Sequence, residues 1–206
     1  LPVEQERVEM APSLAAPTPT EPHAVPPLHL QVLDLSHPGA SRFFAYTSDP
    51  HSLLVKSCRT VLSSLYPPAL AAASKSKDTA PGPPPIRSVT LFLRSFDGVA
   101  HTGGSHLDEE HKEVHLSTSY VAGVSGESAR IKQEIEGVVV HELVHVFQWN
   151  GQGTCPGGII EGIADWVRLG AGLGPPHWGK GGERWDQGYE ATGAFLLLQW
   201  RWPEWN

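Results

Sequence analysis

The stretch GVVVHELVHVFQWNGQGTCPGGIIEGIADWVRLG (residues 137–170) decides the fold of the second half of the chain. From Ile131 onward, apolar residues recur about every 3.6 positions, which predicts two helices, roughly 131–149 and 158–169, separated by a glycine-rich turn. Asp186 is a good N-cap for a third helix. The C-terminal part of the chain is therefore expected to be helical.

The first of these helices carries the pattern His141-Glu142-Leu143-Val144-His145. Residues four apart lie on the same face of a helix, so the two imidazoles can meet one metal ion. Zn²⁺ is the ion that this pattern favours, because catalytic zinc takes three protein ligands and keeps a fourth position open. Glu142 lies beside His141 and can act as the base that takes a proton from water.

A pair of surface histidines on an amphipathic helix is the simpler interpretation of this pattern. It is less favoured because apolar residues surround the histidines and would bury the helix. These residues are Val138, Val139, Val146 and Phe147.

The third ligand is expected on the second helix, sixteen residues after His145. Glu161 and Asp165 are again four apart, so their carboxylates face the same way. One can bind zinc while the other accepts the N–H of a ligand histidine and fixes its tautomer. Two acids in so apolar a segment are costly to bury unless they are paired or bound to metal. We therefore predict that His141 and Glu161 bind the ion with His145, and that Asp165 orients a histidine.

Zinc-dependent amide hydrolysis usually needs a further donor for the tetrahedral oxyanion. Tyr189 is the first candidate and His177 the second, although a half-buried core tyrosine explains Tyr189 nearly as well. His101, His106, His111 and His115 show no ligand spacing on one helix, and we expect solvated loop histidines rather than a second metal site.

The first half of the chain begins with an arm. Residues 1–26 contain six prolines and no sustained apolar period, which predicts a disordered Pro-rich arm before one domain over 27–206. Strands are expected from Leu28 and over 88–96 and 113–121. The last of these can be an edge strand that pairs with an extended substrate.

A helix over about 50–66, capped by Asp49, precedes the two later strands, and 71–85 has the composition of a surface loop. The turn His37-Pro38-Gly39 is expected to connect the first strand to this helix. Strands mostly come first and helices last, so the fold class is α+β.

The two ligand patterns in succession resemble the gluzincin arrangement of thermolysin-type metallopeptidases. More narrowly, residues 137–189 resemble the plant basic secretory protein family, zinc peptidases of plants, fungi and bacteria. The matching segments are GVVVHELVHVFQWNG, PGGIIEGIADWVRL and RWDQGYEATGAFL, with weaker similarity through RSVTLFLRSFDGVAHTGG and KEVHLSTSYV back to LSHPGASRFF. The resemblance covers most of residues 27–200.

This resemblance implies a zincin-like fold, with a small mixed sheet packed on the active-site helix and further helices after it. It also implies peptidase activity on peptide or protein substrates and, commonly, secretion. The chain departs from the family in its acidity, in showing no signal peptide, and in ending at WRWPEWN, where relatives continue with further helices. A truncated chain is therefore expected, and the location, extracellular or cytoplasmic, stays open.

Composition excludes several other classes. A net charge of -7 argues against a nucleic-acid partner, and no run reaches the ~18 apolar residues of a membrane span. We expect a monomer, and Cys58 and Cys155 permit a disulfide without indicating one. Two other functions stay open: a catalytically silent zinc-binding defence or recognition protein, and a zinc hydrolase of non-peptide amides.

Overall fold

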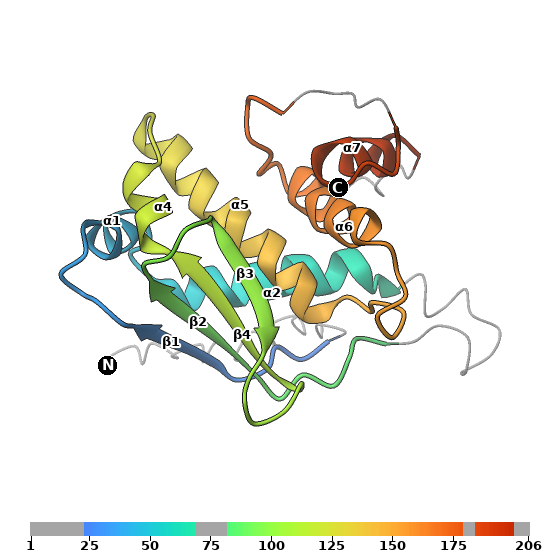
Figure 1. Ribbon diagram of the computed structural model, residues 1–206, viewed down its shortest axis with the longest axis horizontal. Helices are drawn as coiled ribbons and strands as arrows, with labels where there is room; N and C mark the ends of the chain where they lie inside the picture. The colour runs from blue at the N-terminus through green and yellow to red at the C-terminus, as the bar shows by residue number, and fades with distance from the viewer. Residues whose placement is uncertain (1–22, 69–81, 179–183, 200–206) are drawn as a thin grey trace, which may run out of the picture.

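A four-stranded mixed sheet forms the centre of the molecule (Figure 1). The computed structural model describes residues 23–68, 82–178 and 184–199. The strands lie in the order β1-β2-β4-β3. β1 pairs with β2 and β2 with β4 in parallel, whereas β3 is antiparallel to β4 and forms an edge. Their bounds are β1 Leu28–Val32, β2 Ser88–Arg94, β3 Ala100–Gly104 and β4 His111–Ser117.

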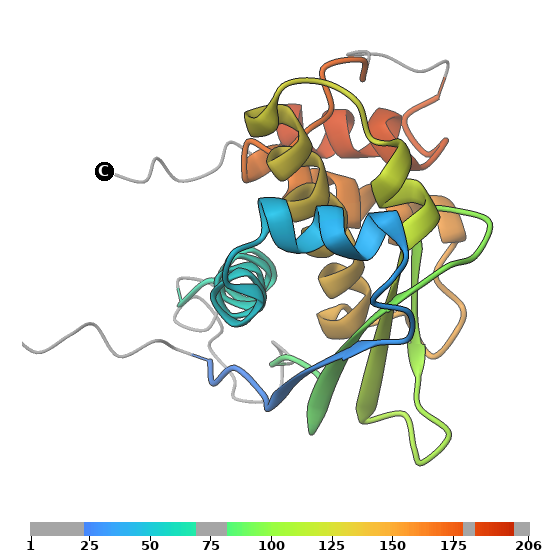
Figure 2. The same cartoon turned by 90° about the vertical axis from the view of Figure 1, so that its left-hand side faces the viewer.

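The helices cover one face of the sheet (Figures 1 and 2). In β2 the alternate residues Val89, Leu91 and Leu93 are fully buried against these helices, while Thr90, Phe92 and Arg94 are only half-buried. The six helices in the described part of the chain are α1 Pro38–Tyr46, α2 Pro50–Leu65, α4 Thr118–Gly123, α5 Ser128–Phe147, α6 Gly157–Gly170 and α7 Tyr189–Gln199. None of the described helices is long and apolar enough to span a bilayer.

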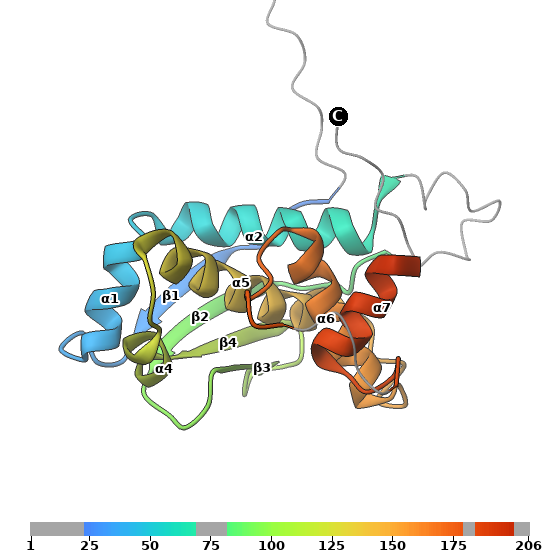
Figure 3. The same cartoon turned by 90° about the horizontal axis from the view of Figure 1, so that it is seen from above.

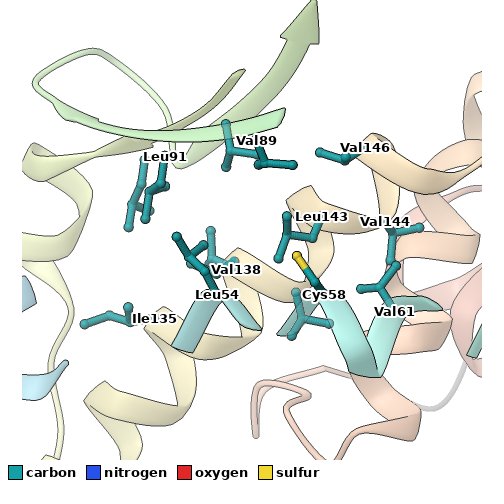
Figure 4. Packing of buried hydrophobic residues seen from close by; sticks show 14 of the residues in the cluster. Leu54, Cys58, Val61, Val89, Leu91, Ile135, Val138, Leu143, Val144 and Val146 are labelled. Carbon is teal, nitrogen blue, oxygen red and sulfur yellow. The ribbon is translucent and has the colours of Figure 1, made fainter. Parts of the chain in front are cut away.

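Helix α5 is central to the core. Figure 4 shows Cys58 and Val61 of α2 beside Leu143 and Val144 of α5, with Leu91 of β2 on the other side of the core. Leu143 is fully buried, and truncation of such a leucine to alanine costs about 2–5 kcal/mol. The helix that bears the histidine pattern is thus fixed on both sides.

Helices α6 and α7 pack side by side next to α5 (Figures 1 and 3). Glycines allow their backbones to approach closely. A Cβ at Gly162 of α6 would overlap the side chain of Thr192, and one at Gly193 of α7 would lie 3.0 Å from Asp165 Cβ. The start of α7 is therefore held against the helix that carries Glu161.

Several predicted elements are found as expected. Asp49 caps α2 by accepting a hydrogen bond from the Ser52 N–H at 3.0 Å, and β1, β2 and α6 lie where periodicity placed them. The mixture of strands and helices around a small mixed sheet is confirmed. Helix α2 lies between β1 and β2 as predicted, but α1 and α4 were not predicted, so strands and helices alternate more than the sequence indicated.

Other predictions were wrong. The expected turn at His37 is the start of α1, where the His37 imidazole accepts from the Gly39 N–H. The predicted strand 113–121 ends at Ser117, whose hydroxyl caps α4 and turns the following β-prone residues into helix. This strand is not an edge, because β3, which was not predicted, pairs with its outer side. Helix α7 starts at Tyr189 rather than at Asp186.

The predicted arm falls mostly outside the described residues. Of its last residues, His23 lies 3.0 Å from the Tyr66 carbonyl oxygen and Val25 packs against the core. Most of the predicted loop 71–85 and the end of the chain also lie outside. Cys58 and Cys155 are free thiols.

Candidate metal centre

Helix α5 presents two imidazoles to one point. His141 and His145 are four residues apart, and their Nε2 atoms lie 3.2 Å from each other. Both rings are partly buried, with side-chain exposures of 13% and 16%. This placement follows from the helical period, since residues four apart share a face.

Helix α6 adds a carboxylate to the same point. Glu161 Oε2 lies 3.2 Å from the Nε2 of His141 and 3.6 Å from that of His145. Ligand atoms about 2.0–2.2 Å from a tetrahedral zinc ion are separated by about 3.3–3.6 Å, so three such atoms at these spacings fit the ion. No other group of three potential ligands lies together in the described part of the chain. The three predicted ligands are thus brought together.

Further contacts orient the two histidines. The Nδ1 of His141 lies 2.7 Å from Oδ1 of Asp165, a carboxylate that is 1% exposed. The Nδ1 of His145 lies 2.7 Å from the side-chain nitrogen of Gln148, the C-cap residue of α5. This contact was not predicted, although Gln148 is only three residues further along the chain. Both Nε2 atoms face the shared point. On His141 the Asp165 carboxylate can only accept, so it places the proton on Nδ1 and leaves the lone pair on Nε2.

The carboxylates dominate the electrostatics of the centre. Burial disfavours the charged form of His141, but the hydrogen bonds to Asp165 and Glu161 outweigh it and raise the pKa of His141 to about 9. The hydrogen bonds with the two imidazoles hold the pKa of Glu161 far below its usual value. The site therefore favours positive charge, as a cation-binding site must.

Glu142 lies on the wall of the cleft beside the histidines. It is 6% exposed, and the Thr102 hydroxyl lies 2.7 Å from Glu142 Oε2 and 3.0 Å from its main-chain oxygen. Thr102 belongs to the unpredicted strand β3, which explains why sequence reasoning missed this contact.

A cleft of about 970 Å³ contains these residues. It runs between β3 on one side and α5 and α6 on the other, and Tyr189 at the start of α7 lines it as well. Tyr189 is 59% exposed, and the pKa of its phenol is raised, first by the negative charge of Glu161 and then by burial. His177 is exposed and is not among the residues that line the cleft.

Other histidines of the chain lie on the sheet or in a loop, and tryptophans lie both in the cleft and in the core. Of the four histidines expected in solvated loops, His106 is exposed between β3 and β4, but His101 lies on β3 and His111 and His115 lie on β4. The rings of His101 and His115 stack with their centroids 4.6 Å apart on the outer face of the sheet. Among the tryptophans, Trp149 and Trp178 line the cleft, whereas Trp166 is 7% exposed and part of the core.

A comparison with known protein families assigns the chain to one of them. A family profile described as peptidase of plants and bacteria matches residues 25–201, nearly all of the described chain. The chain belongs to the basic secretory protein family. The match confirms the resemblance found in the sequence, and it extends over the sheet as well as helices α5 and α6.

Membership of the basic secretory protein family assigns the chain to a group of peptidases. A peptide or protein substrate is consistent with that assignment. No curated protein and no solved structure matches the chain.

Proposed function

We propose that this member of the basic secretory protein family is a zinc-dependent metallopeptidase with a zincin-like fold. His141, His145 and Glu161 would hold Zn²⁺. The proposal rests above all on the mutual spacing of their three ligand atoms, 3.2, 3.2 and 3.6 Å, beside the carboxylate of Glu142 in one cleft. Two nitrogens and one carboxylate oxygen are a donor set that catalytic zinc commonly takes.

Bound zinc would supply Lewis-acid polarisation and lower the pKa of water. Glu142 accepts the proton of the attacking water and then delivers it to the leaving amine. The hydrogen bond from Thr102 holds that carboxylate against the cleft wall. Asp165 keeps the proton of His141 on Nδ1, so that Nε2 carries the lone pair needed for metal binding.

Two further elements act on the substrate. Tyr189 donates a hydrogen bond to the developing oxyanion, and its raised pKa keeps the phenol protonated in neutral solution. The substrate backbone pairs with the free edge of β3, all of whose residues from Ala100 to Gly104 line the cleft. This edge takes the role that the sequence had suggested for the run 113–121.

The test combines metal content with peptide cleavage. Purified protein should bind one zinc ion per chain, cleave members of a peptide library, and lose this activity with a chelator. Glu142→Gln should keep the zinc and lose cleavage by about a thousandfold, because it removes the proton acceptor without touching a ligand.

Glu136→Gln is the matched control, since Glu136 is on the same helix but pairs with Lys56 away from the cleft. It should leave both zinc and turnover unchanged. Zinc binding without any chelator-sensitive cleavage would favour a silent recognition protein. An intact peptide library together with hydrolysis of small amides would favour a non-peptide hydrolase. Full activity of Glu142→Gln would refute the mechanism.

A further inference from the structure

Arg168 is a buried cleft residue that the mechanism above does not use. It lies on α6, seven residues after Glu161, and is only 6% exposed, yet it lines the cleft together with Val138 and Trp178. Buried arginines are rare unless they are paired, so the surroundings of this side chain indicate what it does.

The guanidinium is held rigidly. Its Nη2 donates to Glu134 at 2.9 Å and its Nε to the Leu173 carbonyl at 3.1 Å, while the Trp178 ring lies 4.9 Å from its central carbon. Gly137 of α5 leaves room for it, since a Cβ there would come within 2.6 Å of Nε. Such fixed geometry is what a recognition arginine needs, because little entropy is then lost on binding.

The cluster around Arg168 carries excess positive charge. Glu134 also pairs with Arg130 and accepts a hydrogen bond from the Tyr120 hydroxyl. One carboxylate thus faces two guanidinium groups. In the described part of the chain, Nε and Nη2 of Arg168 have acceptors, whereas Nη1 has none and is not one of the fully buried polar atoms that lack a partner. The N–H groups of Nη1 are therefore accessible from the cleft and can bind an anion there.

The chain direction of a peptide paired with β3 would bring the carboxyl end of that peptide close to Arg168. Ala100 of β3 pairs with Leu116 at the end of β4, just before α4, whose Tyr120 contacts the partner of Arg168. The Ala100 end of β3 is therefore the Arg168 end of the cleft. A substrate added antiparallel to β3, the more stable pairing, runs from Gly104 toward Ala100 and brings its carboxyl end to Arg168.

The helical rise gives the distance along α5 between the Arg168 guanidinium and the proposed metal site. The guanidinium lies against Gly137, six positions before the midpoint of the two histidines, which is about 9 Å along α5 at ~1.5 Å per residue. A guanidinium–carboxylate contact covers roughly 3–4 Å of this span, since its N···O distance is ~2.8 Å. The rest matches one or two extended residues at about 3.3 Å each.

We propose that Arg168 binds the C-terminal carboxylate of the substrate, so that peptides are cut one or two residues before a free carboxyl end. This inference rests on the proposed peptidase function. Arg168 is then a specificity-determining residue as well as a link between α5 and α6.

Matched peptides test the inference. One short peptide is prepared as a free acid and as a C-terminal amide, with the scissile bond two residues from the end. The wild-type protein should cleave the acid with a kcat/KM higher by about tenfold or more. Arg168→Gln should abolish this preference, mainly by raising KM for the acid, and zinc content should not change. The expected loss is about tenfold to a hundredfold, as for a charge-assisted hydrogen bond.

Binding gives a readout that does not need turnover. Calorimetry with the zinc-loaded Glu142→Gln protein should give a Kd about tenfold lower for the acid than for the amide. Glu134→Gln is the structural control. It removes the partner of Arg168 and should lower thermal stability, but it leaves the guanidinium and should keep a preference for the acid.

The outcomes separate this inference from the proposed function. Equal cleavage of acid and amide by the wild type would overturn the role of Arg168 and leave the peptidase proposal standing. If the wild type cleaved neither peptide nor any member of the peptide library, the peptidase proposal would fail, and equal binding of the two peptides would reject the carboxylate site as well. The comparison of the acid and amide peptides on the wild-type protein tests the role of Arg168 even if Arg168→Gln does not fold.

Discussion

Replacement of Asp165 by Asn should weaken zinc binding without removing a ligand. Asp165 is 1% exposed, and its Oδ1 lies 2.7 Å from the Nδ1 of His141. Asparagine can still accept from this N–H with its side-chain oxygen, so the ring should keep its orientation. What is lost is the negative charge that makes His141 a better donor to the metal.

The size of the effect follows from the position of Asp165 behind a single ligand. Loss of such a partner typically lowers metal affinity about 10–100-fold, which corresponds to roughly 1.4–2.7 kcal/mol. The upper end is expected here, because the carboxylate is fully buried and solvent does not screen its charge.

Competition with a zinc-binding chelator at fixed pH measures the dissociation constant, and circular dichroism checks that the variant is folded. Asp186→Asn is the matched control, since it makes the same chemical change at a residue that pairs with exposed Arg184 and does not line the cleft. A folded Asp165→Asn protein that binds zinc within twofold of the wild type would refute the assigned role.

Two other substitutions test neighbouring contacts. Thr102→Val removes the hydrogen bond to the Glu142 carboxylate and should lower kcat about tenfold or more, with zinc content unchanged. Thr102→Ser keeps the hydroxyl and should restore kcat. An unaffected kcat in the valine variant would show that this contact does not position the base. Glu134→Gln should destabilise the protein by about 3–5 kcal/mol at neutral pH, because it leaves Arg168 buried without its carboxylate. Burial raises the pKa of Glu134, but Arg168, Tyr120 and Arg130 together outweigh burial, so this pKa is lowered in the folded state. The contribution of the carboxylate to stability is complete above about pH 4.5 and declines as pH falls through the folded pKa. Urea denaturation should therefore show that the stability difference between wild type and variant shrinks in acid. A constant difference down to about pH 3 would contradict this.

The proposed ligand pattern could be predicted from the sequence because it depends on the helical period alone. His141 and His145 lie on one face of any helix that includes them, as do Glu161 and Asp165 of α6. The apolar residues between them predicted that both helices would be buried, and therefore that their polar residues would meet. Only the relative placement of the two helices needed the structure.

The contacts around this pattern could not be read in the same way. Strand β3 contains Gly103 and Gly104 and has a weak strand signal, so only its pairing with β4 defines it. With β3 unknown, neither Thr102 nor the true edge strand could be assigned. Arg168 follows Asp165 by three residues on α6, but its position in the cleft depends on Gly137 in another helix.

The position of Tyr189 relative to Glu161 depends on residues that have no chemical role. Helix α7 begins where Gly188 packs so closely against Gly158 that a Cβ on Gly188 would lie 3.1 Å from the Gly158 Cα, and Gly188 adopts a positive φ of 94° that favours glycine. Tyr189 itself has a φ of 47°, which is uncommon for a residue with a side chain. Close backbone packing between α6 and α7 therefore imposes this conformation, and the phenol reaches the cleft as a consequence. The proposed metal ligands belong to a local sequence pattern, whereas the position of the proposed oxyanion donor depends on the packing of two helices.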